Sequence, residues 1–169
     1  MAISGRLKLI ADLVTPGGVA ADIGTDHALV PLYLLKENRV SRVIAVDISK
    51  DCLKKAQEAV ARYGLEGRLL PRLCDGLEKL SPFEADSIII SGMGGILMTN
   101  ILQKGIAVTK SAKELILSPH RDPDLVRTFL DENDFEIIYD DVILDKKKSY
   151  CVIKAVNKSI IKTEECTDS

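Results

Sequence analysis

The stretch Val19–Ala28, which reads Val-Ala-Ala-Asp-Ile-Gly-Thr-Asp-His-Ala, decides the fold of this chain. A short apolar run ends in Asp22, passes one glycine at Gly24, and carries Asp26 and His27 where a helix is expected to begin. This order of features, an apolar run followed by an acid, a glycine turn and a helix start, is typical of a buried parallel strand. The carboxyl end of such a strand meets a ligand-binding crevice. The stretch therefore predicts an α/β sheet that binds a ligand at the edge where this strand ends.

Length and composition favour one domain with an aliphatic core. The chain has 169 residues, of which 46% are apolar and only 4% aromatic, with no tryptophan. A core of Leu, Ile, Val and Ala is typical of buried parallel sheets.

Charge, cysteines and hydropathy exclude several classes of protein. The formal net charge of −2 argues neither for nor against a polyanionic partner, because binding can use one face of the molecule. The four cysteines show no CxxC motif and no metal-ligand spacing, so we expect reduced thiols and no metal. No apolar run reaches the ~20 residues of a membrane span, and no signal segment opens the chain. The sequence predicts a cytoplasmic protein without a membrane partner and does not indicate the oligomeric state.

Strands and helices are expected to alternate along the rest of the chain. Apolar runs predict parallel strands at Val19–Ile23, Arg42–Ile48, Leu69–Cys74, Ala85–Ser91 and Glu114–Ser118. Caps, prolines and glycine stops predict helices at Ser4–Val14, Val30–Asn38, 49–64, Ile96–Lys104 and from Asp122 onward, the last with Leu125, Phe129 and Leu130 inward. Thr25–Leu29 is expected to be an extended loop.

The pattern changes near the end of the chain. Phe135–Leu144 and Ser149–Val156 are strands without a helix between them, which predicts an antiparallel hairpin. Five strand–helix units followed by a hairpin predict an α/β, Rossmann-like class I methyltransferase sandwich, with a mostly parallel seven-stranded sheet. A dehydrogenase would instead continue with strand, helix and strand.

The loop after the first strand departs from the dinucleotide-binding pattern G-x-G-x-x-G. Asp26 holds its second glycine position and is followed by His27. A carboxylate there would repel a pyrophosphate, but it suits a ligand with positive charge. S-adenosyl-L-methionine carries an ammonium group, a sulfonium and no phosphate, so we expect this cofactor and disfavour NAD and FAD.

Acids and glycines follow the other strands at the same edge. Asp47 lies 23 residues after Gly24, where a carboxylate can accept hydrogen bonds from both ribose hydroxyls; the alternative is a helix-capping aspartate. Asp75 is placed to accept from the adenine amine, with a turn aspartate as the alternative. The expected cofactor site comprises Asp22, Gly24, Asp26, His27, Asp47, Ile48, Asp75, Gly76, Gly92, Met93 and Gly94.

These motifs resemble a known family. Ala21–Ala28 with Pro31 resembles the first motif of the bacterial tRNA (adenine(22)-N(1))-methyltransferase family (TrmK-like), and Ser91–Gly95 its motif after the fourth strand. Arg6-Leu7 is similar to its N-terminal helix, and Lys148–Tyr150 to the end of its hairpin. The resemblance covers about Ser4–Val156 and implies methylation of N1 of an adenine in tRNA.

Two features depart from that family. Ser118-Pro119-His120 stands where the family usually has Gln-Pro-Asn, which bears on recognition of the acceptor base. The given sequence ends at Ser169 and leaves no room for the family's C-terminal coiled-coil extension, so we expect either a truncated chain or a shortened relative. We expect a methyltransferase domain at 1–158 and a polar, frayed tail at 159–169.

Asp26 is the expected catalytic residue. N1 of adenine already has a lone pair, so a strong base is not needed, but the product is cationic and a carboxylate would stabilise it. His27 and His120 are secondary candidates, whose alternative is hydrogen bonding to the backbone. The expected substrate contacts are Arg6, Tyr33, Gly95, Pro119, His120 and Arg121.

An RNA substrate would also need cations for its phosphates. Solvated surface charge is the alternative for each candidate, and a paired target base must be extruded to expose N1. The candidates are Arg6, Lys8, Arg68, Arg72, Arg121, Arg127 and Lys146–Lys148. Two other functions stay open: methylation of a small molecule or protein, and binding of S-adenosylmethionine without activity.

Overall fold

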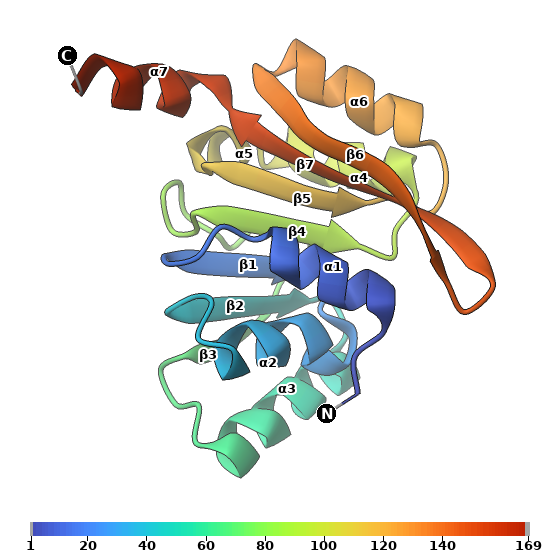
Figure 1. Ribbon diagram of the computed structural model, residues 1–169. Coiled ribbons are helices and arrows are strands. Elements are labelled where there is room, and N and C mark those ends of the chain that lie inside the picture. The colour runs from blue at the N-terminus through green and yellow to red at the C-terminus, as the bar shows by residue number, and fades with distance from the viewer. Residues whose placement is uncertain (1, 168–169) are drawn as a thin grey trace.

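A seven-stranded sheet runs through the middle of the molecule, with helices on both faces (Figure 1). The computed structural model describes residues 2–167. The strand order is β3-β2-β1-β4-β5-β7-β6, in which only the last two strands run antiparallel to their neighbours. The strands are β1 (Val19–Ile23), β2 (Arg42–Asp47), β3 (Leu69–Leu73), β4 (Ser87–Ser91), β5 (Glu114–Ser118), β6 (Phe135–Asp145) and β7 (Lys148–Asn157). The predicted fold class is confirmed.

The helices divide between the two faces of the sheet. One face is covered by α1 (Gly5–Leu13), α2 (Leu29–Lys36) and α3 (Lys50–Tyr63). The other face is covered by α4 (Gly95–Lys104), α5 (Ile106–Ser111) and α6 (Pro123–Glu132). The chain ends in α7 (Lys158–Thr167). No helix in the described part of the chain combines the length and hydropathy that crossing a bilayer requires.

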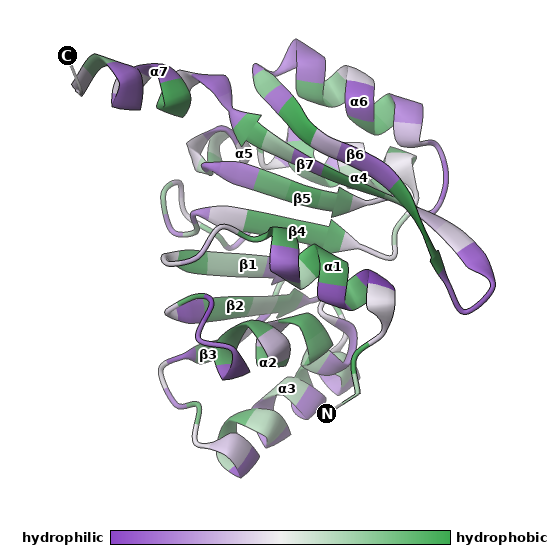
Figure 2. Ribbon diagram, in the orientation of Figure 1, coloured by the Kyte–Doolittle hydropathy of each residue, from purple (hydrophilic) through white to green (hydrophobic). Residues whose placement is uncertain are grey.

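Both faces of the sheet are buried, which explains its unbroken apolar runs. Successive side chains of a strand point to opposite faces. Ile88 and Ile90 accordingly pack under α4 to α6, whereas Ile89 packs under α1 to α3. Figure 2 shows the central strands in hydrophobic colours along most of their length. The aliphatic core predicted from composition is the core observed.

The helix ends follow the capping residues of the sequence. Ser4 Oγ accepts a hydrogen bond from the Leu7 amide at the start of α1, and Ser49 Oγ accepts one from the Cys52 amide at the start of α3. These contacts satisfy amides that have no partner within the helix. Gly64 ends α3 with a φ of 62°, a conformation in which glycine has no steric cost.

The connection between β1 and α2 corrects a prediction. The extended loop expected at Thr25–Leu29 is instead a 3-10 turn, Asp26–Ala28, followed at once by α2. His27 and Ala28 have φ of 59° and 53°, a local conformation that hydropathy does not encode. Pro31 then lies in the first turn of α2, where its missing N–H costs nothing.

Other differences concern α5, α6 and the end of the chain. Helix α6 buries Val126 with Phe129 and Leu130, whereas Leu125 is exposed, because the apolar stripe that packs begins one residue later. Helix α5 was not predicted; it follows α4 directly at Gly105. The tail expected to be frayed is helical as α7 within the described residues.

Candidate cofactor-binding and active site

A cavity of about 210 Å³ opens at the carboxyl edge of the sheet, where β1 and β4 end side by side. It joins the first glycine turn to the loop after β4 and to the start of α1. Its lining residues are Arg6, Leu7, Asp22, Gly24, Thr25, Asp26, Leu29, Val30, Ser91, Gly92 and Met93. The structure thus brings together several predicted cofactor residues with one predicted substrate contact, Arg6.

Gly24 shapes the floor of this cavity. Its φ is 75°, and an added Cβ would lie 2.6 Å from Met93 Cε. The amides of Gly24 and Thr25 both donate to the Val46 carbonyl, at 2.8 and 3.0 Å. Because these donors are used by β2, they are not available to a phosphate, and the loop is not a pyrophosphate cradle.

Asp22 is a buried carboxyl group in the cavity wall, only 4% exposed. Burial raises its pKa to about 7, the neighbouring Thr25 side chain acts in the opposite direction, and the Asp47 carboxylate raises the pKa further. A buried carboxyl whose ionised form lacks a cationic partner favours a positively charged ligand, which would supply one.

Arg6 supplies the opposite charge to the same cavity. Its guanidinium carbon lies 4.4 Å from the centre of the Tyr150 ring, so β7 holds the side chain in place. Its Nε and Nη1 atoms are buried and have no hydrogen-bond partner among the described residues. Unpaired buried donors are costly, and a guanidinium fork matches a carboxylate. A ligand with both an anionic and a cationic group therefore fits this cavity.

The side chains of Asp26 and His27 are exposed to solvent. The Asp26 side chain is 75% exposed and its Oδ1 lies 3.7 Å from His27 Nδ1. Asp26 lines the cavity mouth, whereas His27 is not among the lining residues. The 3-10 turn thus places a solvent-accessible carboxylate at the cavity entrance.

Three predicted cofactor residues lie at the same edge of the sheet but outside this cavity: Asp47, Ile48 and Asp75. One Asp47 oxygen accepts from the Ser49 amide at 2.8 Å, whereas the helix cap itself is Ser49, and the carboxylate retains a second oxygen. Ile48 is exposed. Asp75 lies in a separate open hollow on the side of α4, next to Ile101 and Lys104. Gly76 packs tightly there, since an added Cβ would lie 3.0 Å from Ile101.

The loops that follow β4 and β5 are braced against each other. The His120 amide donates to the Met93 carbonyl at 3.1 Å, and the Gly95 amide donates to the Arg121 carbonyl at 2.9 Å. A Cβ on Gly95 would lie 2.2 Å from the Asp122 carbonyl oxygen. Gly94 packs similarly against the Arg121 side chain, and Pro119 is buried beside them. The glycines of Ser91–Gly95 thus allow loop packing as well as access to the cavity.

Several predicted substrate contacts lie elsewhere. The Tyr33 hydroxyl donates to Asp12 on α1 and does not line the cavity. Arg72 and Arg127 are held by carboxylates, Arg72 by Glu84 and Arg127 by Asp124 and Asp140. His120 and Arg121 remain exposed at the edge.

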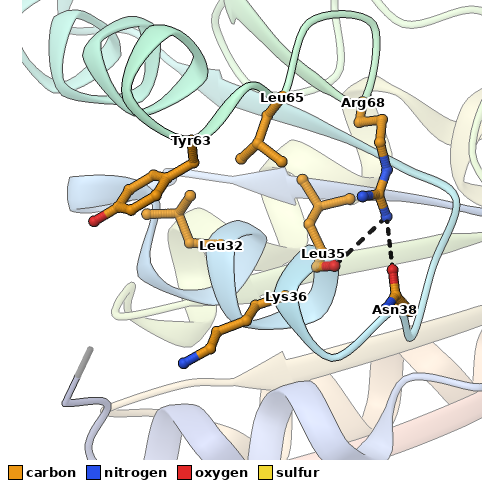
Figure 3. A pocket seen from close by; sticks show the side chains of 7 residues that line it. All are labelled: Leu32, Leu35, Lys36, Asn38, Tyr63, Leu65 and Arg68. Carbon is orange, nitrogen blue, oxygen red and sulfur yellow. Dashed lines mark hydrogen bonds between the residues drawn. The ribbon is translucent and has the colours of Figure 1, made fainter.

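A larger apolar hollow of about 410 Å³ lies between α2, α3 and the start of β3 (Figure 3). In it the Arg68 guanidinium donates to the Leu35 carbonyl and to Asn38 Oδ1, as the dashed lines show. Its lining residues are Leu32, Leu35, Lys36, Asn38, Tyr63, Leu65 and Arg68. None of them is a predicted cofactor residue, so this hollow is separate from the candidate site. Residues 2–167 also contain no cluster of His, Cys, Asp and Glu that could hold a metal ion.

Comparison with known proteins agrees with this geometry. The model of a methyltransferase domain family matches residues 3–153. The crystal structure of the B. subtilis m1A22 tRNA methyltransferase TrmK has a TM-score of 0.88 and 34% identity, covering 92% of this chain and 67% of that one. The chain belongs to the TrmK-like family of methyltransferases.

Comparison by sequence and a second solved structure point to the same family. The Bacillus subtilis tRNA (adenine(22)-N(1))-methyltransferase is 36% identical over 154 residues, which make up 90% of this chain and 64% of the relative. The structure of M. capricolum TrmK in complex with S-adenosyl-homocysteine has a TM-score of 0.85 and 27% identity, over 93% of this chain and 70% of that one. The chain therefore spans just under two thirds of the Bacillus relative.

Sequence reasoning missed part of the cavity wall. Thr25, Leu29 and Val30 line it just before and just after the 3-10 turn Asp26–Ala28. Leu7 reaches it from α1. The sequence predicts that α1 is a helix, but it does not predict which part of the sheet edge α1 covers.

Proposed function

We propose that the chain is an S-adenosyl-L-methionine-dependent methyltransferase that acts on N1 of an adenine in tRNA. The observation that carries the proposal is the cavity at the carboxyl edge, which is lined by Arg6, whose Nε and Nη1 have no hydrogen-bond partner among the described residues, and by Asp22 and Asp26. The amino-acid part of S-adenosylmethionine is a zwitterion next to a sulfonium, and it matches this distribution of charge. The tRNA acceptor is supported by the activity of the Bacillus subtilis relative.

Each part of the cofactor has a residue suited to it. Arg6 would bind the carboxylate, and Asp22 the ammonium group, which would favour the ionised form of Asp22. Asp47 would accept from the ribose hydroxyls, with Ile48 against the adenine. Asp75 would accept from the adenine amine at the neighbouring hollow.

Catalysis rests on position and charge. S-adenosylmethionine supplies a methyl group bound to a positively charged sulfur. The adenine N1 lone pair forms the new N–C bond as the C–S bond breaks, so positive charge moves from sulfur to the base. The braced loops 92–95 and 119–122 would hold the base in line. Asp26, at the cavity entrance, would stabilise the developing cation without removing a proton.

Replacing Arg6 with Met tests the cofactor site by calorimetry. The variant should bind S-adenosylmethionine about 10- to 100-fold more weakly, because a buried charged hydrogen bond is lost. Its affinity for 5′-methylthioadenosine, which lacks the amino-acid part, should not change. Arg62→Met is the matched control, since Arg62 also stacks on a tyrosine, Tyr63, at 5.5 Å. Equal losses for both ligands, or tight binding of NAD, would contradict the proposal.

A further inference from the structure

The β6–β7 hairpin extends well past the edge of the sheet that carries the candidate site. Strand β5 pairs with β7 only as far as Leu117, opposite Ile153, whereas β6 and β7 stay paired to Asp145, opposite Lys148. Residues 148–151 therefore project about 13 Å beyond β5, at ~3.3 Å per residue. Figure 1 shows this arm leaving the body of the molecule at the carboxyl ends of β4 and β5.

The base of the arm is tied to the cofactor cavity. Tyr150 of β7 stacks on Arg6, and Arg6 lines the cavity. Tyr139 and Ile143 on one face of β6 pack with the apolar cluster that includes Leu7 of α1. This contact fixes the direction of the arm, so the rest of it borders the acceptor side of the site.

The opposite face of the arm is apolar and uncovered. Val142 and Leu144 are 61% and 72% exposed. They lie two residues apart on one strand and therefore point to the same side. Exposed apolar side chains on an edge strand are an aggregation risk that proteins usually avoid, so a partner is expected to cover them.

The tip of the arm is cationic. Lys146, Lys147 and Lys148 are exposed and form no ion pair with any residue in the described range, although Asp145 stands opposite Lys148 in the ladder. Lys146 and Lys147 have φ of 47° and 65°. A two-residue turn of this kind favours Asn-Gly, so turn geometry does not explain the two lysines. Strained residues of this type cluster at functional sites.

We propose that this arm, Val142–Tyr150, opens the RNA next to the target adenine. Lysines 146 to 148 would bind phosphates, and Val142 and Leu144 would fill the space that the extruded base leaves. The inference rests on the proposed function. N1 lies on the pairing edge of adenine and is hidden in a duplex, so the base must leave the stack. Apolar side chains inserted at base steps stabilise such unstacked states.

Extrusion can be measured apart from catalysis. The full chain is mixed with tRNA that carries 2-aminopurine in place of adenine 22, whose fluorescence rises when the base unstacks. The wild-type chain should raise the fluorescence severalfold. The double variant Val142→Ser/Leu144→Ser should bind this tRNA within about twofold of wild type but give less than a third of the rise. Phe83→Ser is the control, because Phe83 is also a largely exposed apolar side chain, at 84%, and it lies before the start of β4 at the other edge.

The lysines are tested by salt dependence. Changing Lys146, Lys147 and Lys148 to Gln should weaken tRNA binding and lower the slope of log Kd against log salt by about 2 to 3. The triple change of Lys110, Lys158 and Lys162 to Gln removes the same charge at the opposite edge and should leave the slope unchanged.

The outcomes separate this inference from the proposed function. If the wild-type chain neither binds nor methylates tRNA, the proposed function fails. If it does both, and the arm variants match wild type in fluorescence and salt slope, the arm has no role in extrusion and the inference is overturned.

Discussion

At the residue scale, Asp22 and Asp26 show how one loop gives two carboxyl groups opposite properties. Asp22 is 4% exposed with a pKa raised to about 7, whereas the Asp26 side chain is 75% exposed at the cavity mouth. Active sites commonly hold two carboxyl groups in different environments, which gives the two groups different chemical roles. Asp22 suits recognition of a bound cation, and Asp26 suits stabilisation of a charge that appears during the reaction.

The Asp22 pKa makes stability fall as the pH rises. Between pH ~4 and ~7 the folded chain keeps a proton on Asp22 that the unfolded chain has lost, so the stabilisation present below pH 4 disappears as the pH passes 7. Between these pH values, the free energy of unfolding of the wild-type chain should fall by up to about 4 kcal/mol relative to that of Asp22→Asn. Urea unfolding of both proteins from pH 4 to 8 measures the difference. A constant difference at all pH values would contradict the raised pKa.

Asp26→Asn keeps the size of the side chain and removes its charge. We expect single-turnover methylation of tRNA to slow by about 100-fold, because the cationic product loses its counter-charge. The affinity for S-adenosylmethionine, measured by calorimetry, should change by only a few-fold. Full activity in this variant, or in Asp26→Ala, would remove Asp26 from the mechanism.

At the element scale, the contact between α4 and the loop before α6 holds the acceptor side together. Gly95→Ala would place a Cβ 2.2 Å from the Asp122 carbonyl oxygen, and backbone must shift to relieve it. We expect the free energy of unfolding to fall by about 1 to 3 kcal/mol, which lowers Tm by several degrees. Thermal unfolding measures this effect.

Gly5→Ala is the matched control for that change. Gly5 is also the first residue of its helix, and nothing lies within 4 Å of an added Cβ. Alanine there should leave Tm unchanged or raise it slightly. Equal destabilisation by both changes would show that the Asp122 contact is not responsible.

The elements also show what sequence patterns can predict. The bounds of β1 and β5, the Ser4 and Ser49 caps and the hairpin follow from local hydropathy and capping chemistry, which act over a few residues. The 3-10 turn at Asp26–Ala28 does not, because it depends on left-handed residues that carry no distinctive sequence signal. The exposure of Leu125 depends on how α6 rolls on the sheet, which is a tertiary property.

At the scale of the whole molecule, strand order decides which predicted residues meet. The sequence predicted that acids and glycines would gather at the carboxyl edge, because parallel strands share that edge. It did not predict that Arg6 would reach the same cavity, since this requires α1 to cross the sheet edge beside Tyr150 of β7. The Arg6 side chain, which lies in the same cavity as Asp22, is thus held by a residue from near the other end of the chain.

The most direct test of the account is methyl transfer to RNA. The full chain is incubated with S-adenosylmethionine labelled in the methyl group and with unmodified tRNA, and the digested nucleosides are separated. We expect labelled 1-methyladenosine, strongly reduced in Asp26→Asn and unchanged in Arg62→Met. Tight binding of S-adenosylmethionine without any 1-methyladenosine would contradict it.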